Sequence, residues 1–477
     1  KDVVYYTSDS RVYSLNGMQL PAKVSAYLPQ QSWDDASYGL LGDNCYFEGD
    51  YNGMNVRELD LPELANGALT IYGEWGSVGH QAYLKAYPEA LVTCTSDYYD
   101  SLESFTNEMV SGSDAIDVLR LSSNSTPLTR LIDKGYALDL SGYSEITDLT
   151  ADMDPNLLSC CMKDGKLYAV PVDIDANSFG YSADAWKELG LTEDDVPKTF
   201  MELLDFVENW QYDYADEHTN LKLFDDSGIH MMLLNHLMKN YYAYSLKNDG
   251  KVTYDTELFR KLMAKLDGID FSELDVNLDG SDTATQDEFW SKSAVFNSYS
   301  RLGYPSNYRY DKMMILPLDE GLEPVISCSV TTLMVNTRTP RAEQAVQYLA
   351  TYMMNLESTN ANITIFQNHN DAIPNKDFEK QVADWQTYLE QRKTELEKAE
   401  PADQAGIKSD IAYFEDLIAN SDEYRYDVSA EEIQTYREQV APYLVVTGQT
   451  PLDTWDKDGN NDFYTQMQQS VQGAITA

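Results

Sequence analysis

The sequence predicts an α/β fold of two lobes joined by a hinge, with a small β-hairpin appendage at the N-terminus. Between residues 69 and 170, β-prone runs alternate with helical segments, which is the pattern of a parallel sheet covered by helices. Residues 164–186 have the pattern of a strand, a polar crossing segment and a second strand leading into a helix. A chain of 477 residues exceeds one ordinary core and favours two or three domains.

The N-terminal residues 1–66 contain short β-prone runs separated by turn residues. DVVYYTSDSRVYSLNGM and NCYFEGDYNGMNVREL each hold two such runs, with turns at SDS and YNGM. Such hairpins are typical of propeller blades, but two of them are too few to close a propeller. We therefore expect a small β-rich appendage packed on one lobe.

The hinge is expected just after a tight turn at Asp164-Gly165. Pro171 cannot donate to a sheet ladder, so we expect the strand that follows the turn to stop there or to leave the sheet. The polar residues 172–175 then cross between the lobes, and residues 177–181 form a second strand. A strand, loop and strand within one domain is the alternative interpretation.

Several phrases resemble, in the same order, those of the extracellular solute-binding proteins of ABC importers, the maltose-binding-like group with the periplasmic-binding-protein type II fold. DGKLYAVP resembles the phrase before the first hinge, and LTIYGEWG resembles the first strand with its ligand loop. The other matching phrases are YPEALVTC, SGSDAIDVLRLSSNS, LIDKGYALDLSGY, SKSAVFNSYS, MMILPLDEG and CSVTTLMVNTRTPRAEQAVQYLATYMMN. No single phrase is specific for this family. The ordered set, which extends from about residue 69 to residue 354, is specific for it.

The resemblance implies a division of the chain into an appendage and two lobes. The appendage is residues 1–66, lobe 1 is residues 67–171 and 312–356, and lobe 2 is residues 172–311 and 357–477, with a helical insertion at 375–440.

The insertion is charged and helical in pattern. Phe378, Val382, Trp385 and Leu389 recur at steps of four and three, which places them on one face of a helix, and residues 405–419 are expected to form an antiparallel partner. The insertion is either a decoration of the lobe with a solvated charged face or a surface for a partner.

Charge and hydropathy exclude some functions. A net charge of -45 and a pI near 4.2 argue against binding to nucleic acid or to an anionic membrane. No apolar run approaches the roughly 20 residues of a membrane helix. Because the chain starts at Lys1 without an apolar signal region, we interpret it as a trimmed or mature sequence. The resemblance implies an extracellular or cell-surface protein, lipid-anchored through a segment outside this chain.

Enzyme and cofactor signatures are absent from the sequence. There is no GxSxG, GxxxxGK[ST], HExxH or GxGxxG motif, and His230 and His236 lie six residues apart, off a common helical face. The cysteines form no CxxC pair and are odd in number, so we expect mostly buried free thiols: Cys45, Cys94, Cys160, Cys161 and Cys328. We predict neither an enzyme nor a bound cofactor.

One phrase opens like a calcium loop, with Asp275, Asn277 and Asp279 followed by glycine. The twelfth position is Gln286, where a bidentate carboxylate is expected. A polar surface loop is the preferred interpretation, and no metal site is predicted.

Candidate ligand residues follow from positions in the resemblance, at strand ends that face an interlobe cleft. They combine aromatic rings, which cover the apolar face of a sugar, with carboxylates, amides and hydroxyls that bond its hydroxyl groups. The candidates are Glu74, Trp75, Ser77, Ser122, Ser123, Asn124, Asp173, Asp175, Asn297, Tyr299, Ser300, Ser327, Cys328, Ser329, Trp455, Phe463 and Tyr464.

The resemblance thus implies a monomeric protein that binds a small-molecule solute, foremost an oligosaccharide, and delivers it to an ABC transporter permease. A peptide, polyamine or other cationic solute is favoured instead if Glu74, Asp173 and Asp175 converge without aromatic rings. A glycan-processing enzyme needs two carboxyl groups about 5 to 10 Å apart across a cleft. A scaffold or adhesion protein would have an occluded cleft.

Overall fold

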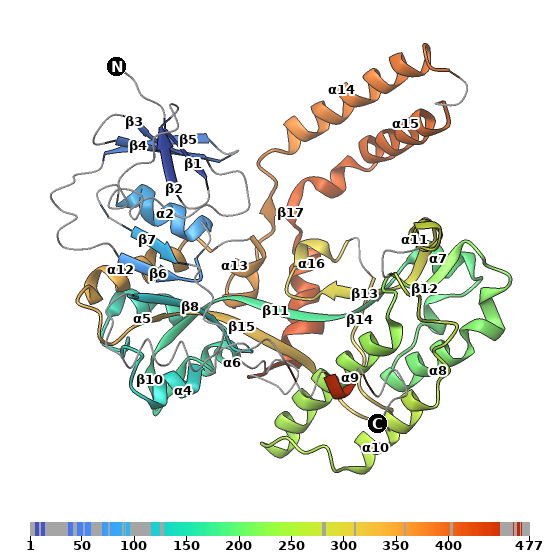
Figure 1. Cartoon of the computed structure of the whole chain (residues 1–477), viewed down its shortest axis with the longest axis horizontal. Helices are drawn as coiled ribbons and strands as arrows, with labels where there is room; N and C mark the ends of the chain where they lie inside the picture. The colour runs from blue at the N-terminus through green and yellow to red at the C-terminus, as the bar shows by residue number, and fades with distance from the viewer. Residues whose placement is uncertain are drawn as a thin grey trace.

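The computed structural model of the 477-residue chain is shown in Figure 1. The residues that the structure describes are 5–8, 11–14, 37–41, 45–50, 53–58, 69–74, 77–87, 90, 92–95, 116–124, 128–278, 283–309, 312–356, 359–400, 404–448, 461, 465–467 and 469.

A nine-stranded mixed sheet runs through the middle of the molecule (Figure 1). Its strands in spatial order are β12 (Leu221–Phe224), β13 (Ser293–Arg301), β11 (Ala169–Tyr181), β15 (Ile326–Val335), β8 (Val118–Ser122), β6 (Leu69–Tyr72) and β7 (Val92–Thr95). Strand β14 (Lys312–Met314) also pairs with β11, and β18 (Leu444–Val446) pairs in parallel with β15. The parallel pairing of β6 with both β7 and β8 agrees with the predicted α/β class.

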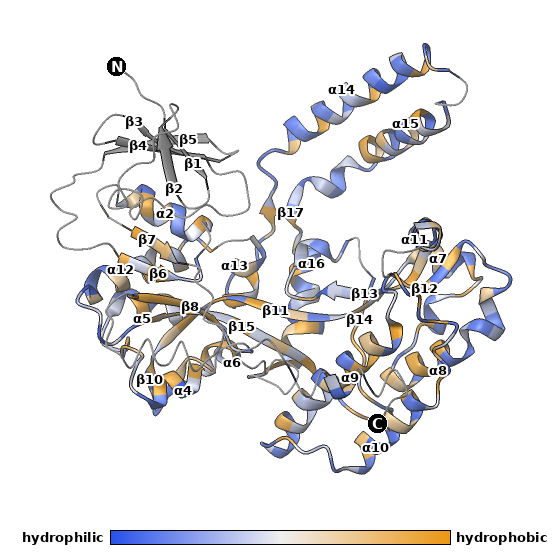
Figure 2. Ribbon diagram, in the orientation of Figure 1, coloured by the Kyte–Doolittle hydropathy of each residue, from blue (hydrophilic) through white to orange (hydrophobic). Residues whose placement is uncertain are grey.

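The sheet serves two separate hydrophobic cores. The first core contains β6, β8 and the first part of β11, up to Ala176, and the second contains Phe179, helix α8 (Phe200–Trp210) and β12. Figure 2 shows apolar residues concentrated in the central strands β8, β11 and β15. Two cores joined by shared strands form the two lobes that the sequence predicts.

Strand β11 belongs to both lobes. Its first part pairs with β15, from Ala169 opposite Met334 to Ala176 opposite Cys328, and its second part pairs with β13 and β14. The expected stop at Pro171 is therefore wrong, because the strand runs unbroken through the proline. The register shifts between Pro171 and Asp173, and proline is tolerated at such an irregularity because its missing N–H interrupts the ladder only locally.

The helices of the first lobe contribute side chains to the first core. Helix α2 begins where Ser77 Oγ accepts a hydrogen bond from His80 N, and it crosses α12 at Gly79, where an added Cβ would lie 2.6 Å from the Tyr352 ring. The helices are α2 (Val78–Ala86), α4 (Leu128–Asp133), α5 (Ser144–Thr150), α6 (Pro155–Ser159), α12 (Ala342–Met353) and α13 (Thr359–Ile365). Asp164 and Gly165 both have positive φ and form the predicted tight turn, between β9 (Met162–Lys163) and β10 (Lys166–Leu167).

The second lobe is rich in helices. Ser182, Thr199 and Thr256 each accept a hydrogen bond from a backbone amide in the first turn of a helix. Besides α8, the helices are α7 (Ala183–Glu188), α9 (Ile229–Asp249), α10 (Glu257–Asp267) and α11 (Thr283–Ser291). None of the helices in the described ranges is long and apolar enough to cross a membrane.

The N-terminal segment forms β-hairpins at the predicted places. Strands β1 (Tyr5–Ser8) and β2 (Arg11–Ser14) pair with each other, and β3 (Ser37–Leu41), β4 (Cys45–Asp50) and β5 (Gly53–Glu58) form a three-stranded antiparallel sheet. The pairings bear out the expected strands and turns, whereas a separate appendage packed on one lobe stays a prediction.

The helical insertion is an antiparallel pair, α14 (Phe378–Leu396) and α15 (Gln404–Ala419), that projects from the body (Figure 1). Much of its surface is hydrophilic (Figure 2). At its base, β16 (Ile373–Pro374) pairs with β17 (Tyr426–Val428).

The chain around the insertion packs differently from the expected division, which places residues 357–477 in lobe 2. Helix α13 and helix α16 (Ala430–Thr435) contribute Ile363, Ile365 and Ile433 to the first core. Among the described residues after 356, only Met467 belongs to the second core. The chain on both sides of the α14–α15 pair therefore packs with the first lobe.

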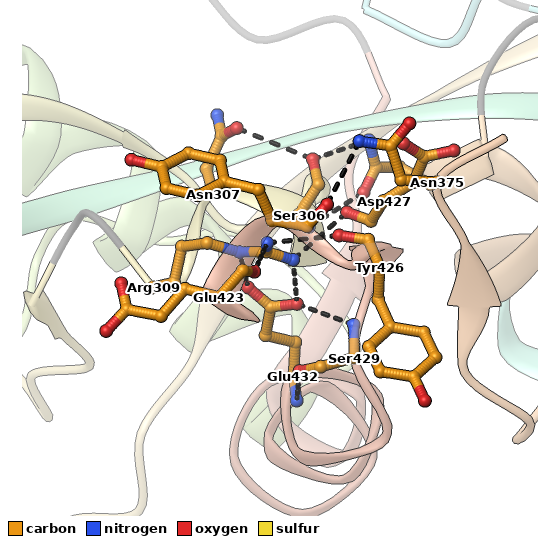
Figure 3. Close-up of polar contacts among 11 residues, drawn as sticks. Ser306, Asn307, Arg309, Asn375, Glu423, Tyr426, Asp427, Ser429 and Glu432 are labelled. Atoms are coloured by element: carbon orange, nitrogen blue, oxygen red, sulfur yellow. Dashed lines mark hydrogen bonds and ion pairs between the residues drawn. The ribbon is translucent and has the colours of Figure 1, made fainter. Parts of the chain in front are cut away.

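Arg309 holds the base of the insertion (Figure 3). It lies in the connection between β13 and β14, and its Nε and Nη2 atoms donate to the two carboxylate oxygens of Glu432, each at 2.6 Å. Its guanidinium also donates to the backbone carbonyls of Glu423, Tyr426 and Asp427, at 2.5 to 3.2 Å. Because the Glu432 side chain is only 7% exposed, its negative charge is stabilised by the guanidinium of Arg309 rather than by water.

Replacing Arg309 by methionine should lower the free energy of unfolding by about 3 kcal/mol, because the nearly buried Glu432 carboxylate loses its counter-charge. Urea unfolding followed by circular dichroism would measure the change. Arg392→Met is the matched control, since Arg392 pairs on the surface with Glu395 and Asp410 and should cost less than about 1 kcal/mol. Equal losses in the two variants would contradict the assignment.

Candidate functional site

A cavity of about 500 Å³ lies where the shared strands pass from one core to the other. It draws residues from both lobes and from the hinge strand itself. Its lining consists of Asn124, Asp175, Asn177, Ser178, Phe179, Asp226, Ser227, Gly228, Met231, Met232, Asn235, His236, Lys239, Asn240, Ser298, Tyr299, Ser327, Ser329 and Thr447.

The wall on the side of the first core is a network of hydroxyl groups. Ser327 Oγ lies 3.1 Å from Thr447 Oγ1, and Ser123 Oγ donates to Thr447 O at 2.9 Å. Ser123 Oγ also accepts from Val330 N at 3.0 Å, which fixes the turn after β8 against β15. Asn124 follows in the same turn and accepts from Ser122 Oγ at 2.7 Å. The network presents small polar groups to the cavity in fixed positions.

The hinge strand contributes Asp175 and Asn177, which lie on one face of β11 because side chains alternate along a strand. Asp175 Oδ1 accepts from Asn177 Nδ2 at 2.7 Å and from Tyr299 Oη at 3.2 Å. Burial, together with the charge of Asp175, raises the pKa of the Tyr299 hydroxyl, which is therefore a donor at neutral pH. The Tyr299 ring is oriented by this bond yet remains 52% exposed.

Helix α9 forms the opposite wall with one of its faces. Six of its residues line the cavity, at spacings of one, three and four that keep them on that face: Met231, Met232, Asn235, His236, Lys239 and Asn240. The other face carries Leu233, Leu234 and Leu237 into the second core. Just before the helix, Asp226 Oδ1 accepts from Gly228 N at 2.8 Å.

His236 is neutral at physiological pH. Its ring packs against Phe179, with centroids 4.1 Å apart, and against Phe200, at 5.6 Å. Burial among these rings, and to a smaller extent the charge of Lys239, lowers the pKa of His236 to about 3. A neutral imidazole has one donor and one acceptor nitrogen.

Of the candidates from the sequence, five line this cavity: Asn124, Asp175, Tyr299, Ser327 and Ser329. Ser122 and Ser123 support it through the bonds described above. Cys328 is fully buried in the first core, because it alternates with the two serines that face the cavity.

Other candidates lie elsewhere in the structure. Glu74 accepts a bond from Ser77 N at 2.7 Å, and both residues are buried at the start of α2. Asp173 accepts from Ile174 N at 2.9 Å, and burial raises the pKa of its carboxyl. Ser300 is 2% exposed, and Asn297 is half-buried beside Gly180. Glu74 and Asp173 do not join Asp175 in the lining of the cavity.

Some candidates lie outside the described residues, and they stay predictions from the sequence: Trp75, Trp455, Phe463, Tyr464 and, in the calcium-like phrase, Asp279. In that phrase, Asp275 Oδ1 accepts from His230 N at 3.1 Å, at the start of α9. Within the described ranges, no group of three His, Cys, Asp or Glu side chains is placed to hold a metal ion.

Among the residues that the structure describes, these cysteines form no disulfide, as expected: Cys94, Cys160, Cys161 and Cys328. The sulfur atoms of Cys160 and Cys161 lie 3.8 Å apart.

Sequence reasoning missed the whole face of α9. The candidates predicted from the sequence include none of Asn235, His236, Lys239 and Asn240. Along the 21-residue helix α9, polar and apolar residues are only weakly segregated, so no amphipathic pattern marks this face in the sequence.

Two α/β lobes, a continuous strand between them and a polar cavity at the crossing define a two-lobed binding protein. The chain belongs to the family of bacterial extracellular solute-binding proteins, whose sequence profile matches residues 80–390. No curated protein sequence matches the chain. The family assignment confirms the resemblance that the ordered phrases predict.

Solved structures of the same fold come from several bacteria. An ABC substrate-binding protein of Listeria monocytogenes, in complex with cycloalternan, has a TM-score of 0.51 at 13% identity, over 86% of this chain and 94% of that one. A cyclic alpha-maltosyl-1,6-maltose binding protein of Arthrobacter globiformis has a TM-score of 0.49 at 15% identity, over 86% and 94%. A protein of xylan utilization in Caldanaerobius polysaccharolyticus has a TM-score of 0.49 at 15% identity, over 86% and 96%.

The lowered pKa of His236 predicts an acid-sensitive fold. Between the ordinary value of 6.5 and about 3, the unfolded chain binds a proton at this residue that the folded chain does not, so the stability falls as the pH falls through this range. Because one pH unit corresponds to about 1.4 kcal/mol once the unfolded histidine is fully protonated, lowering the pH from 6.5 to about 4.5 should remove roughly 2 kcal/mol.

His236→Gln should therefore lose less stability than the parent between about pH 7 and pH 4.5, as measured by urea unfolding at each pH. His369→Gln, at an exposed histidine, should keep the pH dependence of the parent. If all three proteins respond equally to acid, His236 is not held neutral by the fold.

Proposed function

We propose that this protein captures an extracellular oligosaccharide by closing its two lobes around the cavity, and that it delivers the sugar to the permease of an ABC transporter. It acts by binding and release, without chemical conversion of the solute. Outside the cell it works as a monomer that a lipid anchor holds at the surface.

The observation that carries the proposal is the shared lining of the cavity. Ser327 and Thr447 come from the first lobe, and Met231 and Asn235 come from the second. A solute that contacts both walls is bound more tightly when the lobes approach each other, so its binding shifts the population toward the closed state. The volume of about 500 Å³ falls within the usual range for small-molecule sites.

The chemistry of the lining favours a sugar. The half-exposed Tyr299 ring, with the thioethers of Met231 and Met232, provides apolar surface for the carbon face of a pyranose. Hydroxyl and amide groups surround these side chains and match vicinal hydroxyls as donors and acceptors. The Listeria protein of the same fold holds cycloalternan. At 13% identity this likeness establishes the fold alone, so the choice of a sugar depends on the lining.

A cationic solute is the second candidate, because the carboxylates of Asp175 and Asp226 both line the cavity. Lys239 opposes them, and Asp175 is engaged by Tyr299 and Asn177. The affinity of a cationic solute should weaken steeply with salt, whereas the affinity of a neutral sugar should hardly change.

A thermal-shift screen tests the proposal, because a solute that binds only the folded protein raises its melting temperature. The panel should include cycloalternan, raffinose, acarbose, xylo-oligosaccharides and malto-oligosaccharides, with spermidine and a lysine-rich peptide as cationic probes. A shift with one of the sugars is expected at both low and high salt. Shifts with the cationic probes alone would overturn the assignment of a sugar.

For a sugar that raises the melting temperature, Tyr299→Ala should weaken binding by about 10-fold or more, because a stacked ring contributes roughly 1.4 kcal/mol or more. Isothermal titration calorimetry would measure the dissociation constant. Tyr212→Ala is the matched control, since Tyr212 is 89% exposed and lies outside the cavity lining. Unchanged affinity in Tyr299→Ala would remove this ring from the site.

A further inference from the structure

One side chain of α9 bonds directly to the opposite lobe. Asn240 is 6% exposed, and its Oδ1 accepts from the backbone N–H of Ser327 on β15 at 3.3 Å. Ser327 lies between Ile326 and Cys328 of the first core, whereas α9 packs in the second core. This hydrogen bond therefore crosses from one lobe to the other along the wall of the cavity.

The bond to Ser327 fixes which way the Asn240 amide points. A backbone N–H can only donate, so the atom that faces Ser327 is the amide oxygen. The amide nitrogen then faces His236 Nε2, at 2.6 Å. Because an amide NH2 group can only donate, Nε2 must accept, and a neutral His236 carries its proton on Nδ1.

The remaining ring nitrogen is available to a solute. Within the part of the chain that the structure describes, no residue forms a hydrogen bond with His236 Nδ1. A few side-chain polar atoms in this part are fully buried without a partner, and Nδ1 is not among them. Nδ1 thus keeps accessible surface, and His236 is one of the residues that line the cavity.

We propose that Asn240 and His236 form an interlobe latch in which Asn240 is a positioning residue and His236 contacts the solute. Asn240 ties α9 to β15 and holds the imidazole as the Nδ1–H tautomer, and Nδ1–H donates to an acceptor oxygen of the solute. The solute contact rests on the proposed function, whereas the tautomer and the interlobe bond do not.

The two bonds of Asn240 depend on each other. If His236 carried its proton on Nε2, two donors would face each other at 2.6 Å, and the amide would have to turn over. A turned amide would present its NH2 group to Ser327 N–H, which is again a donor against a donor. The position of one proton and the contact between the lobes are therefore coupled.

The proton is located without any solute, by two-bond 1H–15N correlation spectra of the histidine rings in the 15N-labelled full chain at neutral pH. His236→Gln assigns the signals by the loss of one set. The expected pattern is a protonated Nδ1 and an unprotonated Nε2. An Nε2–H tautomer, an imidazolium or an even mixture of tautomers would overturn the latch.

In Asn240→Asp the opposite protonation of the His236 ring is expected, and this variant also controls for misfolding. A carboxylate accepts from Ser327 N–H and has no proton to donate, so it should draw a proton onto His236 Nε2 and reverse the tautomer or create an imidazolium. Asn248→Asp is the matched control on the same helix, where the side chain donates only to Tyr244 O, and it should leave the His236 signals unchanged. An unshifted Nε2 signal in folded Asn240→Asp would overturn the proposal.

The solute contact is tested with each sugar of the thermal-shift panel that raises the melting temperature. The His236 Nδ1 signal should shift on saturation, and His236→Phe, which keeps a ring but lacks the donor, should bind about 10-fold more weakly. An unmoved signal with unchanged affinity would refute the contact. A panel without any sugar hit would count against the oligosaccharide and against this contact, while the spectra of the free protein would still decide the tautomer.

Discussion

The backbone ladder between β11 and β15 is the constraint on which the rest of this structure depends. β11 pairs with β15 from Ala169 to Ala176 and then, within the same strand, with β13 and β14 of the other lobe. Two cores that share a strand cannot separate without breaking main-chain hydrogen bonds, so relative motion of the lobes has to come from bending or twisting of the strands. The cavity sits at this crossing, where such motion changes the distance between its walls.

Local signals in the sequence account for most of the elements. Ser77, Ser182, Thr199 and Thr256 are residue types that favour helix starts, and each caps a helix. The Asp164-Gly165 turn has the positive φ angles that this pair favours. The ordered phrases, taken together, predicted the family. These features depend on a few neighbouring residues or on order along the chain, which a single sequence displays.

Features that depend on packing partners could not be predicted in the same way. Pro171 was expected to end a strand, but its partner across the ladder tolerates a shift of register. The division of the last 121 residues depended on which core α13 and α16 reach, and no local pattern encodes that choice. For the site, Cys328 was predicted together with Ser327 and Ser329, although the alternation of side chains along β15 turns Cys328 into the first core. The α9 wall became apparent only when a distant helix was placed against the hinge.

The closed base of the α14–α15 pair has a consequence for the rest of the molecule. Asn375 N donates to Arg425 O at 3.0 Å, so the two ends of a segment of about fifty residues meet at one point of the body. For the remainder of the molecule, such a segment is equivalent to a short loop, and its length costs little in loop-closure entropy. A change in the length of this arm therefore need not alter the geometry of the hinge.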